Sequence, residues 1–284
     1  MRNYIRMKMK TAQSIRPLKQ FGQHFLKDNA IADKIVQAAG ITRSEPVWEI
    51  GPGHGVLTDR IMELTDDVTA FEIDNRLFEL LSKKYGDKLN LINRDILAVN
   101  WQQLLSEKTA VCGHKLKLIS NLPYQITSPV LYAIEENAQW FSRVILMVQK
   151  EVADRLTAKA GCKAYGVMTL KLNYAFKIDF LFNVPPEAFQ PPPKVYSAVV
   201  MLQPRFDQPA LKSLDTYRLI INKAFAQRRK TLRNNMRAIF NPEDLQKLES
   251  NSGIDFNRRG ETIDESEFVH LADCAFDLSG LSHK

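Results

Sequence analysis

Hydrophobic positions along the chain fall into short apolar runs separated by longer segments with a helical period. The runs occupy residues 47–50, 68–73, 89–92, 116–119, 144–148, 178–184 and 197–202, with helical periods between most of them. A series of this kind is typical of βαβ units. It predicts an α/β fold whose mainly parallel, seven-stranded sheet is covered by helices on both faces.

The last two predicted strands differ from the others in their connection. Residues 185–193 are proline-rich and too short for a crossover helix, so the strands at 178–184 and 197–202 should pair antiparallel. Residues 203–209 contain two prolines and read as a linker. We therefore expect a basic N-terminal arm at 1–20, a ligand-binding domain at 21–205 and a small all-helical C-terminal domain at 206–284.

The C-terminal part is expected to form helices over 211–239, from 242 onward and near 265–276. Within it, residues 223–237 carry six basic side chains and no acid, and the apolar residues recur near helical spacing. One face should therefore pack while the basic face contacts phosphates. The candidate RNA-binding residues are Arg228, Arg229, Lys230, Arg233 and Arg237.

Glycines and polar side chains follow four successive predicted strands. Residues 49–55 read Glu-Ile-Gly-Pro-Gly-His-Gly, and glycines at such a corner let the backbone approach a ligand closely. The carboxyl ends of parallel strands meet at one edge of a sheet, so these positions should converge on one site. The converging residues are Gly51, Gly53, Glu72, Asp95 and Asn121.

Charge and cysteine content narrow the class of protein. The 284 residues have a formal net charge of +7, which favours an anionic partner such as nucleic acid. Three widely spaced cysteines indicate neither a disulfide framework nor a zinc site, and they fit a reducing cytoplasm. The basic first ten residues lack the apolar core of a secretory signal, and no run of about 18 apolar residues is present, so we expect no membrane span.

These motifs together resemble a known enzyme class. Residues 49–53 with Glu72, Asp95 and the Asn-Leu-Pro-Tyr segment at 121–124 are similar to class I S-adenosylmethionine-dependent methyltransferases. Adding Gln-Phe-Gly-Gln-His-Phe-Leu at 20–26 and Phe-Gln-Pro-Pro-Pro-Lys-Val-Tyr-Ser-Ala-Val at 189–199, the chain closely resembles the small-subunit ribosomal RNA adenine N6-dimethyltransferases. The resemblance covers most of residues 14–240 and implies a Rossmann-like fold.

The resemblance also implies the cofactor, the substrate and residue roles. His24 and Leu26 would contact S-adenosylmethionine, Gly51 its methionine portion, Glu72 its ribose and Asp95 its adenine. The substrate would be two adjacent adenosines in a hairpin loop near the 3′ end of small-subunit ribosomal RNA. A partly assembled small subunit is the expected partner, with a role in subunit biogenesis. The protein is expected to act as a cytoplasmic monomer without a metal.

The segment 121–124 explains how such a site could activate an adenine. The exocyclic nitrogen of adenine is a poor nucleophile, because its lone pair is delocalised into the ring. The Asn121 side-chain oxygen and the Leu122 carbonyl can each accept a hydrogen bond from one of the two hydrogens on this nitrogen. This arrangement favours a pyramidal nitrogen whose lone pair points toward an electrophile. Pro123 restricts Leu122 to an extended conformation. Tyr124 offers a ring for the base to stack on, and Phe189 is expected to cover the other face.

Other functions remain open on the sequence. The related family that dimethylates large-subunit ribosomal RNA and confers antibiotic resistance shares most motifs, although Leu122 and the triple proline before Lys194 favour the small-subunit family. A non-catalytic nucleic-acid-binding relative could keep the fold, although the intact segment 121–124 argues against it. An oxidoreductase that binds a dinucleotide is disfavoured, because the spacing is Gly-x-Gly-x-Gly rather than Gly-x-Gly-x-x-Gly.

Overall fold

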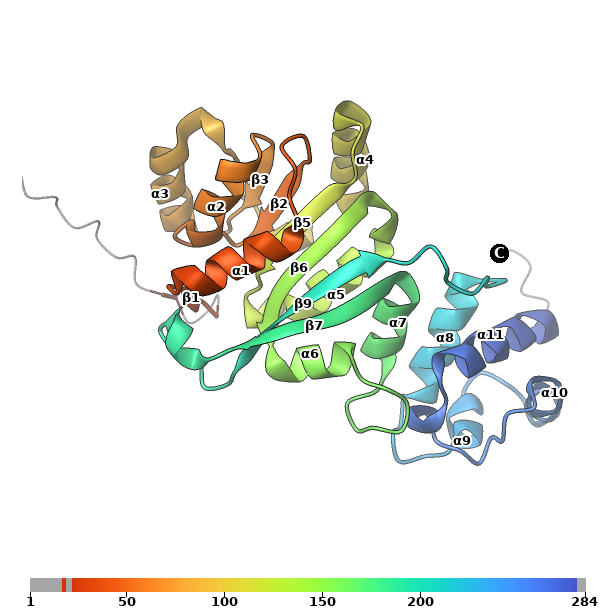
Figure 1. Cartoon of the computed structure of the whole chain (residues 1–284). Coiled ribbons are helices and arrows are strands. Elements are labelled where there is room, and N and C mark those ends of the chain that lie inside the picture. Colours follow the sequence, from red (N-terminus) through yellow and green to blue (C-terminus); the bar gives the residue numbers. More distant parts are fainter. Residues whose placement is uncertain (1–16, 19–21, 280–284) are drawn as a thin grey trace, which may run out of the picture.

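The computed structural model describes residues 17–18 and 22–279, so the predicted basic arm lies almost wholly outside the described residues. A seven-stranded sheet runs through the larger part of the molecule in the order β4-β3-β2-β5-β6-β9-β7 (Figure 1). Its strands are β2 (Val47–Ile50), β3 (Val68–Phe71), β4 (Asn90–Ile92), β5 (Leu116–Asn121), β6 (Phe141–Gln149), β7 (Phe176–Val184) and β9 (Ser197–Pro204).

The sheet confirms the predicted mainly parallel architecture. β9 pairs antiparallel with both of its neighbours, β6 and β7, whereas the pairs from β4 to β6 are parallel. The sheet is therefore α/β and Rossmann-like, with one reversed strand as expected from the short proline-rich connection. β5 extends to Asn121, two residues beyond the predicted run, and β3 ends before Glu72.

Helices cover both faces of the sheet. On one face α1 and α2 pack over one set of buried strand residues, and on the other α4 to α7 cover the residues of opposite parity, such as Trp48 and Leu118. The alternation along each strand thus creates two apolar layers. The helices are α1 (Asn29–Ala39), α2 (Val56–Leu64), α3 (Asn75–Tyr85), α4 (Trp101–Cys112), α5 (Thr127–Glu136), α6 (Lys150–Leu156) and α7 (Val167–Ala175).

The sequence pattern did not predict a two-stranded ribbon that the structure contains. β1 (Phe25–Leu26) pairs antiparallel with β8 (Phe189–Gln190), and Lys27 N donates to Ala188 O at 2.9 Å. Each strand is two residues long, too short to produce a recognisable alternation. The ribbon holds the segment before α1 against the segment before β9, at the carboxyl edge of the sheet.

The C-terminal helices are α8 (Leu214–Ala224), α9 (Leu232–Met236), α10 (Pro242–Ser252) and α11 (Glu265–Ser279). They surround a separate apolar core that also contains Tyr165 and Leu170 from the part of the chain that builds the sheet. Within the described residues, no helix has the length and apolar character needed to cross a bilayer.

The predicted helical stretch over 211–239 is wrong in one respect, because it breaks between α8 and α9. The Asn235 side chain donates to Ala224 O at 2.8 Å and to Gln227 O at 3.2 Å, so it satisfies one carbonyl at the end of α8 and one in the turn that follows. Thr231 then caps α9 by accepting from Asn234 N. The basic residues at 228–230 consequently lie in a turn, not on a helix face.

Candidate functional site

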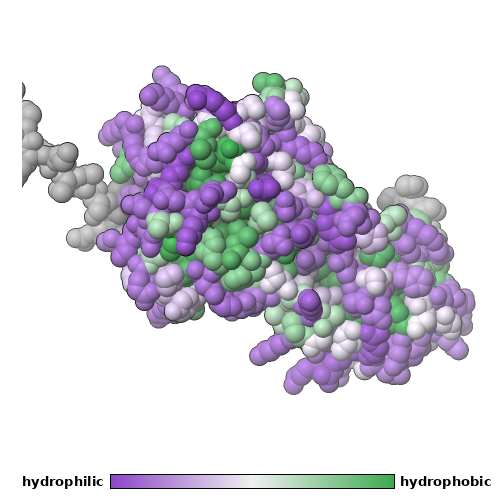
Figure 2. All heavy atoms as spheres, in the orientation of Figure 1, coloured by the Kyte–Doolittle hydropathy of each residue, from purple (hydrophilic) through white to green (hydrophobic). Residues whose placement is uncertain are grey.

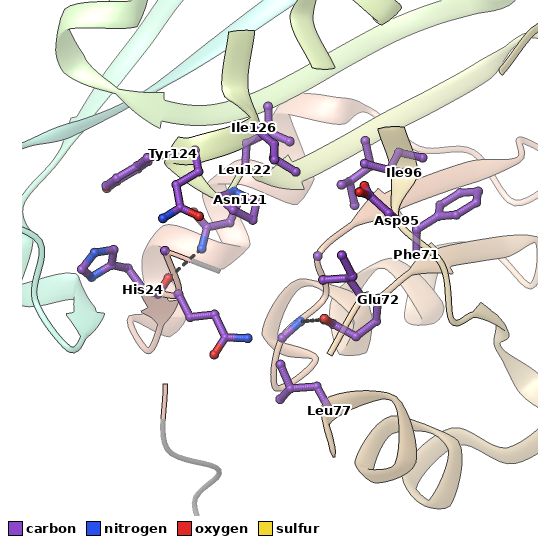
Figure 3. Close-up of a pocket in the computed structure, with 18 of the residues that line it drawn as sticks. His24, Phe71, Glu72, Leu77, Asp95, Ile96, Asn121, Leu122, Tyr124 and Ile126 are labelled. Atoms are coloured by element: carbon purple, nitrogen blue, oxygen red, sulfur yellow. Dashed lines mark hydrogen bonds between the residues drawn. The ribbon is translucent and has the colours of Figure 1, made fainter. Parts of the chain in front are cut away.

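A hollow opens at the carboxyl ends of β2, β3, β4 and β5, where the sequence predicts a site. Its volume is about 920 Å³ including the open mouth. Figure 3 shows Phe71, Glu72 and Asp95 on one side and His24, Asn121 and Tyr124 on the other. The predicted residues that line it are His24, Gly51, Gly53, Glu72, Asp95, Asn121, Leu122, Pro123 and Tyr124.

The glycine corner after β2 shapes the floor of the hollow. Gly51 and Gly53 have backbone φ angles of 66° and 60°, which residues other than glycine rarely adopt. A Cβ atom added to Gly53 would lie 3.0 Å from the Phe25 ring. The two glycines thus give a tight turn whose backbone is accessible from the hollow.

Glu72 is a buried carboxyl at the end of β3, only 4% exposed. Its Oε2 accepts from Gly53 N at 3.3 Å and its Oε1 accepts from Asp74 N at 2.9 Å. Burial raises the pKa of Glu72 to about 7, and the two backbone hydrogen bonds oppose that rise. The carboxyl is therefore fixed in orientation and costly to ionise while nothing else binds it.

Asp95 follows β4 and begins the short 3₁₀ turn Ile96–Ala98, where its side chain accepts from Leu97 N at 2.9 Å. Beside it, Phe71 and Ile96 are almost fully buried and line the same wall of the hollow. A flat ring would find apolar surface there and a carboxylate at its edge. The sequence did not predict this apolar wall, although Phe71 directly precedes Glu72 and Ile96 directly follows Asp95.

Asn121 presents one oriented amide at the end of β5. Its Nδ2 donates to His24 O at 3.0 Å, which fixes the plane of the amide. Among the described residues, no group donates to Asn121 Oδ1 or to the Leu122 carbonyl, while Leu122 N donates to Met147 O at 3.2 Å. Asn121 Oδ1 and the Leu122 carbonyl are thus two acceptors without a donor in the described chain, on adjacent residues that line the hollow.

Tyr124 is held by contacts from two distant segments. Its hydroxyl and the Ser197 hydroxyl lie 2.6 Å apart, and its ring stacks on the His24 ring with centroids 5.5 Å apart and an interplanar angle of 29°. His24 Nδ1 lies 2.8 Å from Pro191 O. Ser197 was not foreseen as part of the site, because only folding brings it to Tyr124.

Two predicted residues do not face the hollow. Phe189 is 1% exposed and belongs to the apolar layer under α1 and α2, so the expectation that its ring covers a bound base is wrong for this arrangement. The β1–β8 ribbon places Phe189 opposite Leu26 and turns it inward, while Gln190 points outward. Leu26 is 6% exposed and lines a smaller neighbouring cavity with Pro52 and Val56.

The basic residues of the C-terminal helices divide into paired and unpaired groups. Arg228 forms an ion pair with Glu261 at 2.9 Å, and Arg233 is paired with Glu249. Arg229, Lys230 and Arg237 are exposed and have no ion-pair partner among residues 22–279. Only the second group has its full charge available to phosphates.

Comparison with known proteins gives a consistent result. The family model for ribosomal RNA adenine dimethylases matches residues 16–275. The ribosomal RNA small subunit methyltransferase A of Picosynechococcus sp. is 39% identical over 269 residues, which cover 91% of this chain and 97% of that protein.

Solved structures agree with this fold. A dimethyladenosine transferase from Plasmodium falciparum superposes with a TM-score of 0.73 at 27% identity, covering 90% of this chain and 98% of that one. The 23S rRNA methyltransferase ErmE superposes with a TM-score of 0.67 at 22% identity, covering 88% of this chain and 98% of that one, and shows the fold alone. Since the family model spans nearly the whole chain and a relative shares 39% identity over most of its length, the chain belongs to the ribosomal RNA adenine dimethylase family.

Proposed function

We propose that this protein transfers methyl groups from S-adenosylmethionine to the exocyclic N6 of two adjacent adenosines in small-subunit ribosomal RNA. The observation that carries the proposal is the pair of unoccupied acceptors, Asn121 Oδ1 and the Leu122 carbonyl, beside a hollow with a buried carboxyl. The name of the relative from Picosynechococcus supports the small subunit as the source of the RNA.

The wall with Glu72 and Asp95 fits the cofactor. The Glu72 carboxylate can accept the hydroxyls of a ribose, and the Asp95 carboxylate can accept from an adenine amine whose ring packs on Phe71 and Ile96. Gly51, whose φ of 66° favours glycine, presents bare backbone to the methionine portion. When bound, S-adenosylmethionine supplies a methyl group already activated by its sulfonium.

The opposite wall fits the target adenine. Asn121 Oδ1 and the Leu122 carbonyl accept the two N6 hydrogens, so the nitrogen lone pair turns toward the cofactor side of the hollow. The nitrogen loses a proton to water after transfer, because an amide oxygen and a backbone carbonyl accept hydrogen bonds but are too weakly basic to take up the proton. The base stacks on the face of Tyr124 that His24 leaves open, a contact worth ~1–3 kcal/mol.

The RNA is held outside the hollow. An adenine must leave its stack to reach Tyr124, and a hairpin-loop nucleotide costs less to extrude than a paired one. A pocket for one base cannot read its surroundings, so the exposed Arg229, Lys230 and Arg237 bind phosphates of a folded RNA. The natural substrate is a partly assembled small subunit, on which the protein acts as a monomer in the cytoplasm.

A transfer assay tests this function. Purified protein is incubated with methyl-labelled S-adenosylmethionine and with small or large ribosomal subunits from a strain that lacks the gene. Label should enter small-subunit RNA through N6 of adenosine. Label confined to large-subunit RNA would assign the protein to the resistance enzymes, and bound cofactor with no transfer to either RNA would indicate a non-catalytic relative.

A further inference from the structure

Six of the eleven Lys and Arg residues at 206–279 form ion pairs within the described protein. Each of the paired residues lies within ion-pair distance of an acid, which lowers its value as a phosphate ligand. The pairs are Lys212 with Asp277, Arg218 with Glu135, Arg228 with Glu261, Arg233 with Glu249, Lys247 with Asp244 and Arg258 with Glu267. Figure 2 shows a mainly hydrophilic surface over these helices.

Two further exposed lysines lie outside the C-terminal helices, in the part of the chain that builds the sheet. Residues 157–166 connect α6 to α7, and in this connecting segment Lys159 and Lys163 are exposed without an ion-pair partner in the described chain. Figure 1 shows the connecting segment below the sheet, beside α9. Although it belongs to the domain that holds the sheet, it lies next to the turn that carries Arg229 and Lys230.

Hydrogen bonds fix the connecting segment on the C-terminal helices. Gly161 N donates to Glu261 O at 2.7 Å. Tyr165 is 4% exposed and packs edge-on against Phe225 with ring centroids 6.0 Å apart. The segment is therefore an ordered part of the interface between the two parts of the molecule.

Arg228 is the centre of this attachment. Its Nη2 donates to Lys163 O at 2.7 Å, to Tyr165 O at 3.4 Å and to Glu261 Oε2 at 2.9 Å. A phosphate that engaged Arg228 would have to compete with all three acceptors. The next residues along the chain, Arg229 and Lys230, are exposed and have no such partner in the part of the chain that the structure describes.

We propose that the connecting segment is a second phosphate-binding element for the RNA, and that Arg228 positions it instead of binding phosphate. Lys159 and Lys163 then form one continuous basic surface with Arg229 and Lys230, so that a folded RNA is gripped across both parts of the protein. The inference rests on the proposed function, because it assumes that the substrate is an RNA, and it adds the surface that binds the RNA.

A salt titration of binding tests the lysines. Lys159→Gln/Lys163→Gln is compared with wild type on purified small subunits and large subunits from the strain that lacks the gene. Losing two phosphate contacts should reduce the slope of log affinity against log salt by roughly 1.4–1.8 and weaken binding about 20-fold at about 0.15 M salt. The matched control is Lys83→Gln/Lys88→Gln, two exposed unpaired lysines at and just after the end of α3.

The control Lys83→Gln/Lys88→Gln should bind like wild type. If Lys159→Gln/Lys163→Gln also binds like wild type, the proposal is overturned. A drop in slope on whichever subunit the wild type binds supports the surface, even if that subunit is the large one and the proposed substrate is wrong. Wild-type protein that binds neither subunit would overturn both.

Charge-preserving substitutions test Arg228. Arg228→Lys keeps the charge, but its nitrogen lies nearer the backbone than Arg228 Nη2 and does not reach the three acceptors, so it should raise KM for the RNA as much as Arg228→Gln, with kcat unchanged. Arg229→Lys should keep the wild-type KM. Hydrogen exchange of the Gly161 amide should accelerate in Arg228→Lys and stay slow in Arg229→Lys, at equal melting temperatures. Wild-type KM and exchange in Arg228→Lys would show that Arg228 acts as a simple charge.

Discussion

Ionisation of Glu72 should oppose folding of the free protein. The ordinary pKa of 4.5 is raised to about 7 in the folded state by burial. Between these values the folded protein holds a proton that the unfolded chain has released, so stability falls as pH rises through this window and levels off above it. A shift of about 2.5 pH units corresponds to roughly 3 kcal/mol.

Glu72→Gln removes this pH-dependent cost. The amide oxygen of Gln can accept a hydrogen bond from only one of the two backbone N–H groups, those of Gly53 and Asp74. The stability lost with the other hydrogen bond is the same at every pH. The free energy of unfolding of the variant, relative to wild type, should therefore rise by roughly 2–3 kcal/mol between pH 5 and pH 8.5. Glu49, whose pKa is raised chiefly by burial and further by the Glu72 charge, adds to the same trend, because the substitution also removes that repulsion.

Urea unfolding followed by tryptophan fluorescence measures this difference. The three tryptophans, Trp48, Trp101 and Trp140, all belong to the part of the molecule that contains the sheet, so they report on the region around Glu72. Glu79→Gln, the same change at an exposed position on α3, is the matched control. A relative stability of Glu72→Gln that stays constant from pH 5 to pH 8.5 would refute the reasoning.

Four further substitutions separate the roles assigned to the site. Glu72→Ala should weaken S-adenosylmethionine binding at least about tenfold, because charge-assisted ribose contacts are lost, and calorimetry showing equal affinity would remove Glu72 from the cofactor site. Asn121→Ala should keep most cofactor binding but lower single-turnover methylation by about 10²- to 10³-fold, as for loss of one preorganised polar contact; an unchanged rate is incompatible with the acceptor role. Phe189→Leu should lower the melting temperature with little change in kcat, because its ring is buried, whereas Tyr124→Leu should raise KM for the RNA and leave the fold intact. The reverse pattern would restore Phe189 to the base-binding wall.

The position of the site followed from the sequence because it depends on local rules. Gly51, Glu72, Asp95 and Asn121 each come where a predicted strand ends, and parallel strands bring such positions to one edge. The antiparallel direction of β9 could be predicted equally well, since a short proline-rich connection excludes a crossover helix. Both conclusions need only element type and connection length.

The errors concern contacts between segments far apart in the sequence. Phe189 faces inward because two-residue strands pair across more than 160 residues, a contact that no periodicity reveals. Arg228 and Arg233 are neutralised by Glu261 and Glu249, which the basic segment itself does not contain. The break before α9 involves Asn235 as well as the N-cap Thr231, and the hydrogen bond from the Asn235 side chain to Ala224 O is visible only in three dimensions.

The central claim is that the acceptor pair at Asn121 and Leu122 directs methyl transfer to adenine N6 in small-subunit ribosomal RNA. Mass spectrometry of nuclease digests tests it most directly, after purified protein and S-adenosylmethionine have acted on small subunits from the strain that lacks the gene. We predict up to four methyl groups per RNA, two on the N6 of each of two adjacent adenosines in a hairpin loop near the 3′ end, and almost none with Asn121→Ala. Methyl groups on another atom or only on large-subunit RNA, or full methylation by Asn121→Ala, would contradict the account.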